Sequence, residues 1–367
     1  MLVKEFSELS IETSKSSASS DKETENESAS SSTSTGDSDE SFDFGENGYF
    51  PVENGLCLKN RFEILSLLGS GGFATVHKVH DLETKSTVAM KIGRSGEMDN
   101  ETCEKEIEML ELVSSGHENI VQFTSHFSVC GPYGSHFVMV FELLDTDLFT
   151  ILASTSAEKL LSLDTVRRFS KDILNGLDYI HQKCGVVHCD IKPENIMISR
   201  TGTLKLGDFG LAVLNSEGCT FTVGTCHYRA PEIFLNSKIS YSADLWSFGC
   251  TLFEMITRKK LFQCPNECDK IQHMKKIAGT TGEIIYQQFY RRTSQNDENF
   301  EMVFGKHTVF VSNAKPWLNP ELLKVWHPMM EQEAKEVSDL LKKILRSDPK
   351  KRLTAKKAME HPFLFNC

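Results

Sequence analysis

The residues best suited to chemistry lie in one short segment, His188–Asn195 (HCDIKPEN). It places a carboxylate at Asp190, an ammonium group at Lys192 and a side-chain amide at Asn195. Phosphoryl transfer needs a group that orients a hydroxyl and accepts its proton, a cation that neutralises the transferring phosphoryl, and oxygen ligands for a metal ion. At this spacing, the three side chains can supply one of these functions each.

Two further motifs follow in the order that this chemistry requires. Asp208-Phe209-Gly210 begins thirteen residues after Asn195 and provides a carboxylate for a metal ion. Mg²⁺ is the hard cation that suits carboxylate, amide and phosphate oxygens. Ala230-Pro231-Glu232 comes next, after a polar loop of Thr, Ser and Gly. Each tripeptide alone could occur by chance, but their order and distances indicate one site.

A glycine-rich stretch, Leu68–Val76 (LGSGGFATV), lies between two strand-like runs. Glycines at such a turn let backbone N–H groups approach phosphates without obstruction by a Cβ atom. No helix is expected next, as a dinucleotide-binding fold would require, and the GK[ST] of a P-loop is absent. Taken alone, the stretch fits a glycine-rich hairpin as well as a phosphate-binding loop.

Lys91 lies on the strand that follows, and the next predicted helix gives it a partner. A lysine that holds phosphates needs an anion to fix its position, and a helical glutamate can provide one. We prefer Glu106 because it lies on the apolar face of this helix. Glu104 and Glu108 are the alternatives.

The elements that must position these residues begin with a strand-rich part. Residues 61–92 have a strand-like pattern punctuated by glycine, and residues 101–116 predict one helix. Residues 137–143 form a continuous apolar run of the length of a buried strand.

Helices dominate the rest of the chain. Residues 242–257 are apolar on nearly all sides, which predicts a buried central helix, and residues 336–363 predict two helices around Pro349. Residues 165–184 predict an amphipathic helix whose apolar stripe is formed by Val166, Phe169, Ile173, Leu177 and Ile180. The predicted fold class is therefore α+β.

The formal net charge of −11 over 367 residues is unevenly distributed. Residues 1–50 hold three lysines against twelve acidic residues and so carry −9 of it. Residues 14–41 have almost no apolar side chains that could offset ordering entropy, which predicts a disordered tail. This tail fits an acidic solvating segment or a regulatory segment phosphorylated at Ser38. The nearly neutral remainder argues against a generally basic nucleic-acid-binding domain.

Cysteine usage and hydropathy indicate the compartment. The eleven cysteines include no CxxC pair, and Cys264 and Cys268 lack a second pair that would complete a zinc site. Scattered reduced cysteines are typical of the cytoplasm or nucleus. No run of about 18 apolar residues predicts a membrane span, and the N-terminus lacks the apolar core of a secretory signal. We therefore expect a cytoplasmic or nuclear protein.

With these motifs in this order, the sequence resembles a eukaryotic protein kinase over essentially all of its ordered part. The resemblance implies a two-lobed protein kinase fold, with a small antiparallel β-sheet lobe that carries one main helix and a larger, mostly helical lobe. The organisation it implies is a disordered acidic Ser-rich tail at 1–48, a lead-in at 49–61, a kinase domain at 62–363 with lobes 62–143 and 144–363, and a C-terminal end at 364–367.

The resemblance also implies an activity and its site. The chain would transfer the γ-phosphoryl group of ATP, with Mg²⁺, to Ser or Thr hydroxyls of proteins. Asp190 would be the catalytic base, with catalytic roles for Lys91, Glu106, Lys192 and Asn195. Asn195 and Asp208 would be the metal ligands. The residues that would bind ATP are Leu68, Gly69, Ser70, Gly71, Gly72, Phe73, Ala74, Val76, Ala89, Lys91, Phe141, Glu142, Leu144, Asp147 and Met197.

Within this ATP site, the resemblance assigns places to particular residues. Phe141 would be the gatekeeper, and Glu142 and Leu144 the hinge that hydrogen-bonds adenine. Asp147 would reach the ribose. The adenine ring would be sandwiched by Val76, Ala89 and Met197.

Other residues would shape the activation segment and the catalytic loop. Thr225 would hydrogen-bond Asp190 and Lys192, and Arg229 would shape the pocket after the acceptor residue. Asp244 would hold the catalytic loop from the central helix. Glu232 would form a structural ion pair with Arg352.

The branch of the family is indicated by several segments. Residues 227–232 (HYRAPE) and the stretch 261–279 resemble the CMGC group. Residues 48–76 and 179–197 look most like SR-protein kinases, whereas HYRAPE looks more like LAMMER and DYRK kinases. The subfamily is left open.

Two positions depart from the kinase pattern. Ala74 replaces the third glycine of the loop, which predicts a modest change in nucleotide affinity. Cys189 replaces the Arg that normally pairs with an activation-loop phosphate and orders that loop. Because cysteine cannot make this pair, we predict activity without loop phosphorylation.

The alternative function is a pseudokinase scaffold with weak or no phosphotransfer. For the active kinase we expect a monomer that acts on protein substrates, with Ser or Thr near Arg or Pro, and that has no direct nucleic-acid or membrane partner. Phosphorylation of tyrosine is an open alternative.

Overall fold

The computed structural model describes residues 48–114, 116–154, 160–234, 237–262, 318, 320–346 and 348–365. Several predicted features lie outside them: residues 1–47 of the acidic tail with Ser38, the pair Cys264 and Cys268, most of the stretch 261–279, and the last two residues. Gly48, the last residue of the predicted tail, is described and accepts a hydrogen bond from Ser95 N at 2.7 Å. In the part that is described, no helix combines the length and the apolar character that crossing a bilayer requires.

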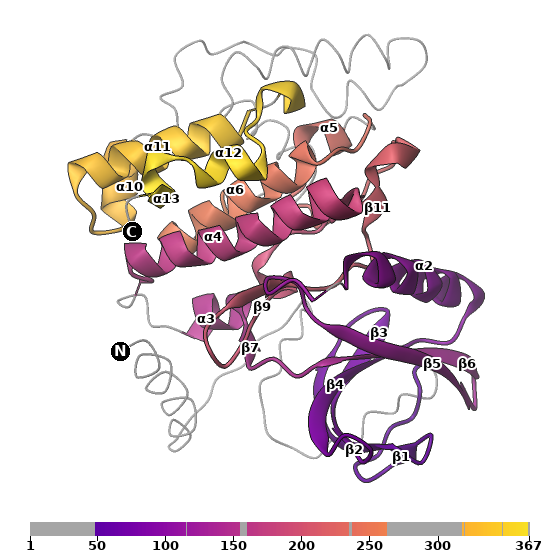
Figure 1. Cartoon of the computed structure of the whole chain (residues 1–367). Coiled ribbons are helices and arrows are strands. Elements are labelled where there is room, and N and C mark those ends of the chain that lie inside the picture. The colour runs from indigo at the N-terminus through magenta and orange to yellow at the C-terminus, as the bar shows by residue number, and fades with distance from the viewer. Residues whose placement is uncertain are drawn as a thin grey trace, which may run out of the picture.

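The small lobe is built on one antiparallel sheet with strand order β1-β2-β3-β4-β6-β5. Helix α2 (Glu97–Val113) lies on the side of the sheet that faces the large lobe (Figure 1). The strands are β1 (Cys57–Leu58), β2 (Phe62–Ser70), β3 (Ala74–Asp81), β4 (Ser86–Gly93), β5 (Phe123–Gly131) and β6 (Gly134–Glu142).

Alternate residues of these strands point to the apolar interior of the sheet, as the two-residue period of a strand requires. The interior is filled by buried side chains such as Ile64, Val79, Met90 and Val138. Phe50, from the predicted lead-in, is part of the same cluster. The lead-in is therefore packed onto this lobe rather than free of it.

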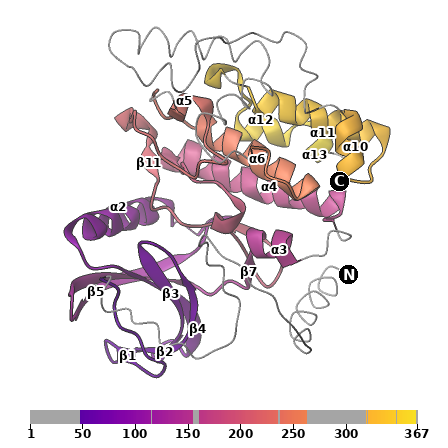
Figure 2. The ribbon, with the colours of Figure 1, turned by 180° about the vertical axis from the view of Figure 1, so that it is seen from behind.

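The large lobe is mostly helical, and its helices run across the top of Figure 1 and, seen from behind, of Figure 2. Its helices are α3 (Leu148–Ser154), α4 (Leu163–Tyr179), α5 (Pro231–Phe234), α6 (Ser242–Thr257), α10 (Pro320–Trp326), α11 (Glu331–Ile344), α12 (Ala355–Met359) and α13 (Pro362–Phe365). The short helical turns are η1 (Ile180–Cys184), η2 (Pro193–Asn195), η3 (Asn215–Glu217) and η4 (Pro349–Lys351).

Short strands lie where the two lobes meet. One small sheet has the order β10-β9-β7, and the other pairs β11 with β8. Their bounds are β7 (Thr146–Asp147), β8 (Val186–Val187), β9 (Ile196–Ile198), β10 (Leu204–Leu206) and β11 (Val213–Leu214). These strands frame the loops that carry His188–Asn195 and Asp208.

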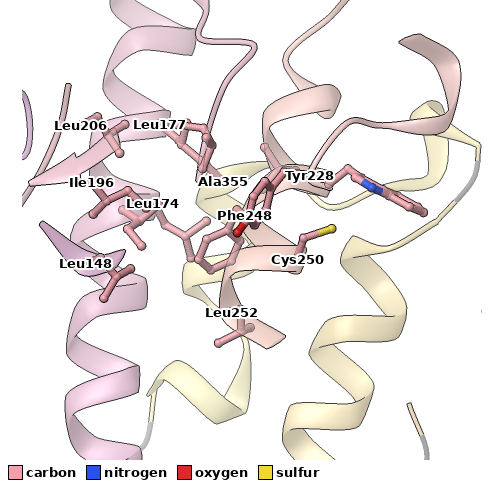
Figure 3. Packing of buried hydrophobic residues seen from close by; sticks show 14 of the residues in the cluster. Leu148, Leu174, Leu177, Ile196, Leu206, Tyr228, Phe248, Cys250, Leu252 and Ala355 are labelled. Carbon is pink, nitrogen blue, oxygen red and sulfur yellow. The ribbon is translucent and has the colours of Figure 1, made fainter. Parts of the chain in front are cut away.

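The predicted central helix, residues 242–257, is confirmed as α6. Every residue from Ala243 to Thr257 is buried, and the helix packs against α4 and the C-terminal helices (Figure 3). A helix that is apolar on all sides can be stable only inside a core. Among its few polar residues is Asp244, whose side chain is fully buried.

Helix α4 shows how local sequence sets an element. Its N-cap residue Ser162 accepts a 3.1 Å hydrogen bond from the backbone N–H of Thr165, which satisfies one of the free donors of the first turn. All five residues of the predicted apolar stripe are completely buried. The helix then passes into the π-turn η1, which ends at Gly185 with φ 72°.

The C-terminal prediction needs correction in one respect. Residues 336–363 were expected to hold two helices, but α11 is followed by the turn η4 and then by two short helices, α12 and α13. Asp348 and Thr354 each accept a backbone N–H at the start of η4 and α12. Each of these polar side chains therefore begins a new element.

Candidate active site

The loop that carries Asp190 is held by backbone hydrogen bonds to Asp244 of α6. The N–H groups of His188 and Cys189 each donate a 2.8 Å hydrogen bond to the Asp244 carboxylate. Cys189 has φ 67°, in the left-handed region that residues with a Cβ rarely adopt. His188 Nε2 donates to the carbonyl oxygen of Gly207 at 2.9 Å, which ties this loop to the segment before Asp208.

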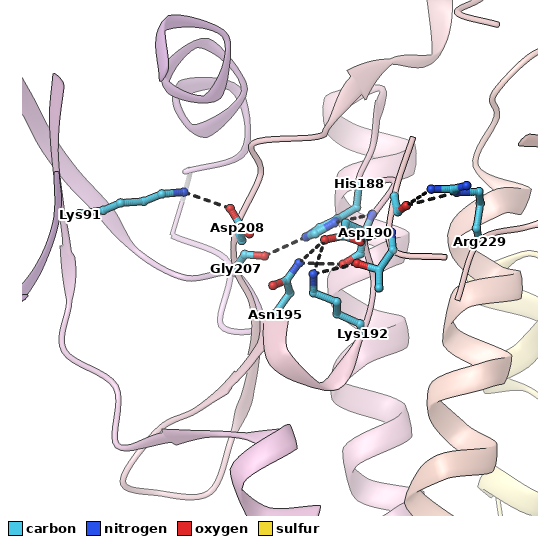
Figure 4. A network of polar contacts seen from close by, with 10 residues as sticks. Lys91, His188, Asp190, Lys192, Asn195, Gly207, Asp208 and Arg229 are labelled. Atoms are coloured by element: carbon cyan, nitrogen blue, oxygen red, sulfur yellow. Dashed lines mark hydrogen bonds and ion pairs between the residues drawn. The ribbon is translucent and has the colours of Figure 1, made fainter. Parts of the chain in front are cut away.

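Three predicted residues, Lys192, Asn195 and Thr225, converge on the Asp190 carboxylate (Figure 4). Lys192 Nζ lies 2.8 Å from Asp190 Oδ2 and 2.9 Å from Thr225 Oγ1. Asn195 Nδ2 donates at 2.9 Å to both the Asp190 carbonyl and Oδ2. The backbone N–H of Thr225 donates to Oδ1 at 2.7 Å. The carboxylate is therefore oriented on both of its oxygens.

These contacts set the protonation state of Asp190. Burial alone would raise its pKa, but the hydrogen bonds from Lys192 and Thr225 and the charge of Lys192 outweigh burial and hold the pKa below the usual range. The group is ionised at neutral pH. It can accept a hydrogen bond from a hydroxyl, although it is a weak base before any reaction begins.

The predicted ion pair between Lys91 and Glu106 is confirmed. Lys91 Nζ lies 2.7 and 2.8 Å from the two carboxylate oxygens of Glu106, and 3.1 Å from Asp208 Oδ1. Glu106 is buried on α2, whereas the alternatives Glu104 and Glu108 are exposed. Burial alone would lower the pKa of Lys91, but the two carboxylates raise it well above its usual range.

The donor set fits a hard divalent cation. Asn195 uses its amide nitrogen on Asp190, which leaves the amide oxygen available, and Asp208 has a half-exposed carboxylate. The positive charge of Lys91 lowers the pKa of Asp208, so this carboxylate is ionised. Within the described part of the chain, no cluster of three or more His, Cys, Asp or Glu could hold a metal alone. A cation here would need further oxygen ligands from a bound phosphate.

The glycine-rich stretch forms the turn between β2 and β3, where Gly71 N donates to the Ala74 carbonyl at 2.9 Å. A Cβ atom at Gly69 or Gly72 would meet no atom within 4 Å. Neither glycine is therefore required by packing against the part of the chain that the structure describes. This open space favours the phosphate-binding interpretation over a simple hairpin.

The residues predicted to surround adenine lie between the lobes. Both lobes contribute to this set, and all of its members are half-buried: Val76, Ala89, Phe141, Leu144 and Met197. Ala89 of β4 pairs with Phe141 of β6, and Met197 of β9 pairs with Asp147 of β7.

Two hinge-region side chains have structural partners. Glu142 Oε1 accepts hydrogen bonds from Lys205 Nζ at 2.7 Å and from Gln122 N at 2.8 Å. Both carboxylate oxygens of Asp147 accept hydrogen bonds from Thr150, at 2.7 and 2.8 Å, so Asp147 caps the first turn of α3, which begins at the next residue. If Asp147 contacts the ribose as predicted, the same carboxylate would have this second role.

The activation segment is fixed by Arg229, Glu232 and Arg352. Arg229 donates to the carbonyl oxygens of Val223 and Gly224, at 3.0 and 2.6 Å. Glu232 forms a buried bidentate ion pair with Arg352 at 2.5 and 2.6 Å, as the family resemblance implies. Gly224 has φ +84°, and a Cβ there would lie 2.3 Å from the carbonyl oxygen of Cys189.

A pair of acidic residues beside this segment was missed in the sequence analysis. Glu194 has a buried Oε2 atom with no hydrogen-bond partner among the described residues. Nearby, Tyr228 Oη donates to Glu254 Oε2 at 2.6 Å. Burial raises the pKa of Glu254, and the negative charge of Glu194 acts in the same direction. The signal that could have found Glu254 is a carboxylate within an otherwise apolar helix.

Comparison with known proteins places this site in a family. Residues 62–364 match the protein kinase domain. The chain therefore belongs to the protein kinase family, and its two lobes form the protein kinase fold.

The similar proteins include members of several branches. The chain is 28% identical to "Serine/threonine-protein kinase SRPK" of Physarum polycephalum, over 88% of this chain and 90% of that protein. It is 30% identical to human "Dual specificity tyrosine-phosphorylation-regulated kinase 3", over 84% of this chain but only 54% of that protein. It is 27% identical to "Serine/threonine-protein kinase AFC2" of Arabidopsis thaliana, over 87% of this chain and 80% of that protein. All are kinases of the CMGC group, which confirms the predicted group.

The close approach at Gly224 gives a test of the site geometry. Gly224→Ala should lower the kcat of peptide phosphorylation at least about tenfold, because the added Cβ must displace Thr225 from Asp190. Gly55→Ala is the matched control: Gly55 also has positive φ, +86°, but nothing lies within 4 Å of its added Cβ. Equal kcat values for the two variants would contradict the proposed role of this contact.

Proposed function

We propose that this chain is an active protein kinase that transfers the γ-phosphoryl group of ATP to Ser or Thr hydroxyls of protein substrates. The observation that carries the proposal is the complete Asp190 cluster, in which Lys192, Asn195 and Thr225 orient one ionised carboxylate. The Lys91–Glu106 ion pair lies beside it, joined through Asp208.

Each side chain has a role that its contacts support. Asp190 would orient the acceptor hydroxyl and take its proton late in the transfer, since a loose phosphoryl transition state needs little help from a base. Its lowered pKa suits this role, because the group stays ionised and ready to accept. Lys192 would neutralise charge on the transferring phosphoryl, and Lys91, fixed by Glu106, would hold the α- and β-phosphates.

Mg²⁺ would be held by Asn195 and Asp208 together with phosphate oxygens, and would neutralise the charge of the triphosphate when bound. The Asn195 amide oxygen and the ionised Asp208 carboxylate support this assignment. The backbone of residues 68–74 would cover the phosphates from the small lobe.

The pseudokinase alternative rests on Ala74 and Cys189. Ala74 is buried at the start of β3 and its carbonyl closes the turn of the loop, so the turn forms without a third glycine. Cys189 contributes its backbone N–H to Asp244, a contact that does not depend on the side chain. Neither substitution removes a group that the proposed transfer uses.

A phosphate-incorporation assay on a generic basic protein separates the two functions. The unmodified chain should transfer phosphate, whereas Asp190→Asn should lower kcat by about a hundredfold or more, the loss expected for a missing base and orienting group. Lys91→Met should lower the rate of transfer strongly as well, and chelation by EDTA should abolish transfer. Equal phosphate incorporation by the unmodified chain, Asp190→Asn and Lys91→Met would contradict the kinase function and favour the pseudokinase scaffold.

We further propose that activity does not require a phosphate on the activation segment. The Cys189 side chain is buried and lies 3.6 Å from the Val187 carbonyl oxygen, so it cannot reach a phosphate. Thr225 already connects the segment to Asp190 and Lys192, and Arg229 holds the Val223 and Gly224 carbonyls within the segment. These contacts would therefore order the activation segment without the Arg–phosphate pair that orders it in other kinases.

Phosphatase treatment tests this independence. The treated chain should keep its activity within about twofold, and Thr222→Ala should behave like the untreated chain, because no charge-assisted pair is lost. If treatment abolished activity and mass spectrometry assigned the effect to phosphate on Thr222 or Thr225, the proposal would be wrong.

The surroundings of the activation segment support substrates with Ser or Thr near Arg or Pro. The half-buried Glu194 carboxylate and the nearby Glu254 place negative charge beside the segment, and this charge would attract a guanidinium. The Val223 and Gly224 carbonyls are already occupied by Arg229. A proline after the acceptor, which has no N–H to donate, would therefore lose no hydrogen bond there.

The arginine preference can be measured with a peptide series in which one Arg is moved along an alanine-rich peptide around a Ser. Glu194→Gln should lower the ratio of kcat/KM between the best Arg peptide and the Arg-free peptide about tenfold or more, since a charged hydrogen bond is lost. Glu360→Gln, at an exposed glutamate, is the control and should leave the ratio unchanged. A ratio unaffected by Glu194→Gln would overturn the assignment.

A further inference from the structure

Two residues outside the predicted ATP site, Tyr49 and Arg94, contact the tip of the glycine-rich loop. Tyr49 Oη donates a 2.7 Å hydrogen bond to the Gly71 carbonyl oxygen. Arg94 Nη1 donates to the Gly72 carbonyl at 3.0 Å, and Arg94 N donates to the Phe73 carbonyl at 2.9 Å. Three consecutive carbonyl groups of the loop are therefore held by two residues.

The two side chains are themselves fixed by the small lobe. The guanidinium carbon of Arg94 lies 5.1 Å from the centroid of the Tyr49 ring, within the range of a cation–π interaction. The Gly48 carbonyl accepts hydrogen bonds from Ser95 N at 2.7 Å and Ser95 Oγ at 3.2 Å. Phe50, on the other side of Tyr49, is buried in the sheet core. Tyr49 is thus anchored by both of its chain neighbours.

These contacts orient the loop's hydrogen-bond donors. In a planar trans peptide, the C=O of one residue and the N–H of the next point in opposite directions. The bonds to the Gly71 and Gly72 carbonyls therefore turn the N–H groups of Gly72 and Phe73 away from Tyr49 and Arg94. Successive N–H groups that point the same way form an anion-binding concavity.

We infer that Tyr49 and Arg94 are positioning residues that hold these two N–H groups in the orientation that binds the phosphates of ATP. This inference rests on the proposed ATP-dependent function. Without the contacts, the loop would have to be ordered when the nucleotide binds, and this ordering would lower the affinity. The loss would concern only ligands that carry phosphates.

The test compares ADP with adenosine on the full-length chain. Tyr49→Phe removes one hydroxyl and keeps the ring beside Arg94. Calorimetric titration should show a Kd for ADP about three- to tenfold higher, the effect of one ordinary hydrogen bond. The affinity for adenosine, measured by competition against a fluorescent adenine-site ligand, should change less than twofold. Arg94→Met, which keeps the aliphatic stem, should give the same selective loss.

The control is Tyr133→Phe, since Tyr133 is half-exposed in the turn between β5 and β6 of the same lobe. It should change neither affinity. Equal losses for ADP and adenosine in Tyr49→Phe and Arg94→Met would indicate a general distortion of the lobe and would overturn the inference. Unchanged ADP affinity in both variants would overturn it too. Failure of the unmodified chain to bind ADP or ATP would instead overturn the proposed function.

Discussion

The site depends on one buried carboxylate, that of Asp244. It accepts the backbone N–H groups of His188 and Cys189, and His181 Nε2 donates to it as well, all at 2.8 Å. Hydrogen bonds to an ionised acceptor are about twice as strong as neutral ones. They stabilise the left-handed conformation of Cys189, which costs about 1–2 kcal/mol in a residue with a Cβ. These bonds also set the position of Asp190, because it directly follows Cys189 in the chain.

Asp244 belongs to α6, so the loop that carries Asp190 takes its position from a helix that is buried along nearly its whole length. The small lobe contributes through the Lys91–Glu106 ion pair, which requires α2 to lie against the sheet. Asp208 touches Lys91 from the segment after β10, and that segment is tied to the catalytic loop through His188 and Gly207. The proposed phosphoryl transfer would therefore need residues of both lobes to be in contact at once.

The sequence predicts well what depends on local pattern. Helix α6 has its predicted bounds because its apolar run is continuous, and the stripe of α4 is buried throughout. The HCDIKPEN segment and Asp208 come together because each follows a short strand in the same region of the large lobe. Helix α2 begins at Glu97 rather than residue 101, since acidic Glu97 and Asp99 favour its first turn although they break the apolar pattern.

The sequence could not predict contacts between residues that lie far apart in the chain, because no periodic pattern links them. Tyr49 meets Gly71 across 22 positions, and Tyr228 meets Glu254 across 26. No local rule distinguishes Glu194 from any other glutamate, because its importance comes from a buried oxygen without a partner among the described residues. The short C-terminal helices were missed because single polar caps, rather than apolar patterns, divide them.

The burial of Cys189 also has a consequence for oxidative chemistry. Burial raises the pKa of its thiol far above the usual range, and the nearby carboxylate of Asp244 raises it further. Only the thiolate reacts readily with peroxides and alkylating electrophiles, so this thiol is inert at neutral pH. Among the cysteines that the structure describes, Cys57 and Cys130 are exposed and free and would be modified before Cys189. Mild oxidants should therefore leave the Cys189 thiol unmodified, although it lies one residue from Asp190.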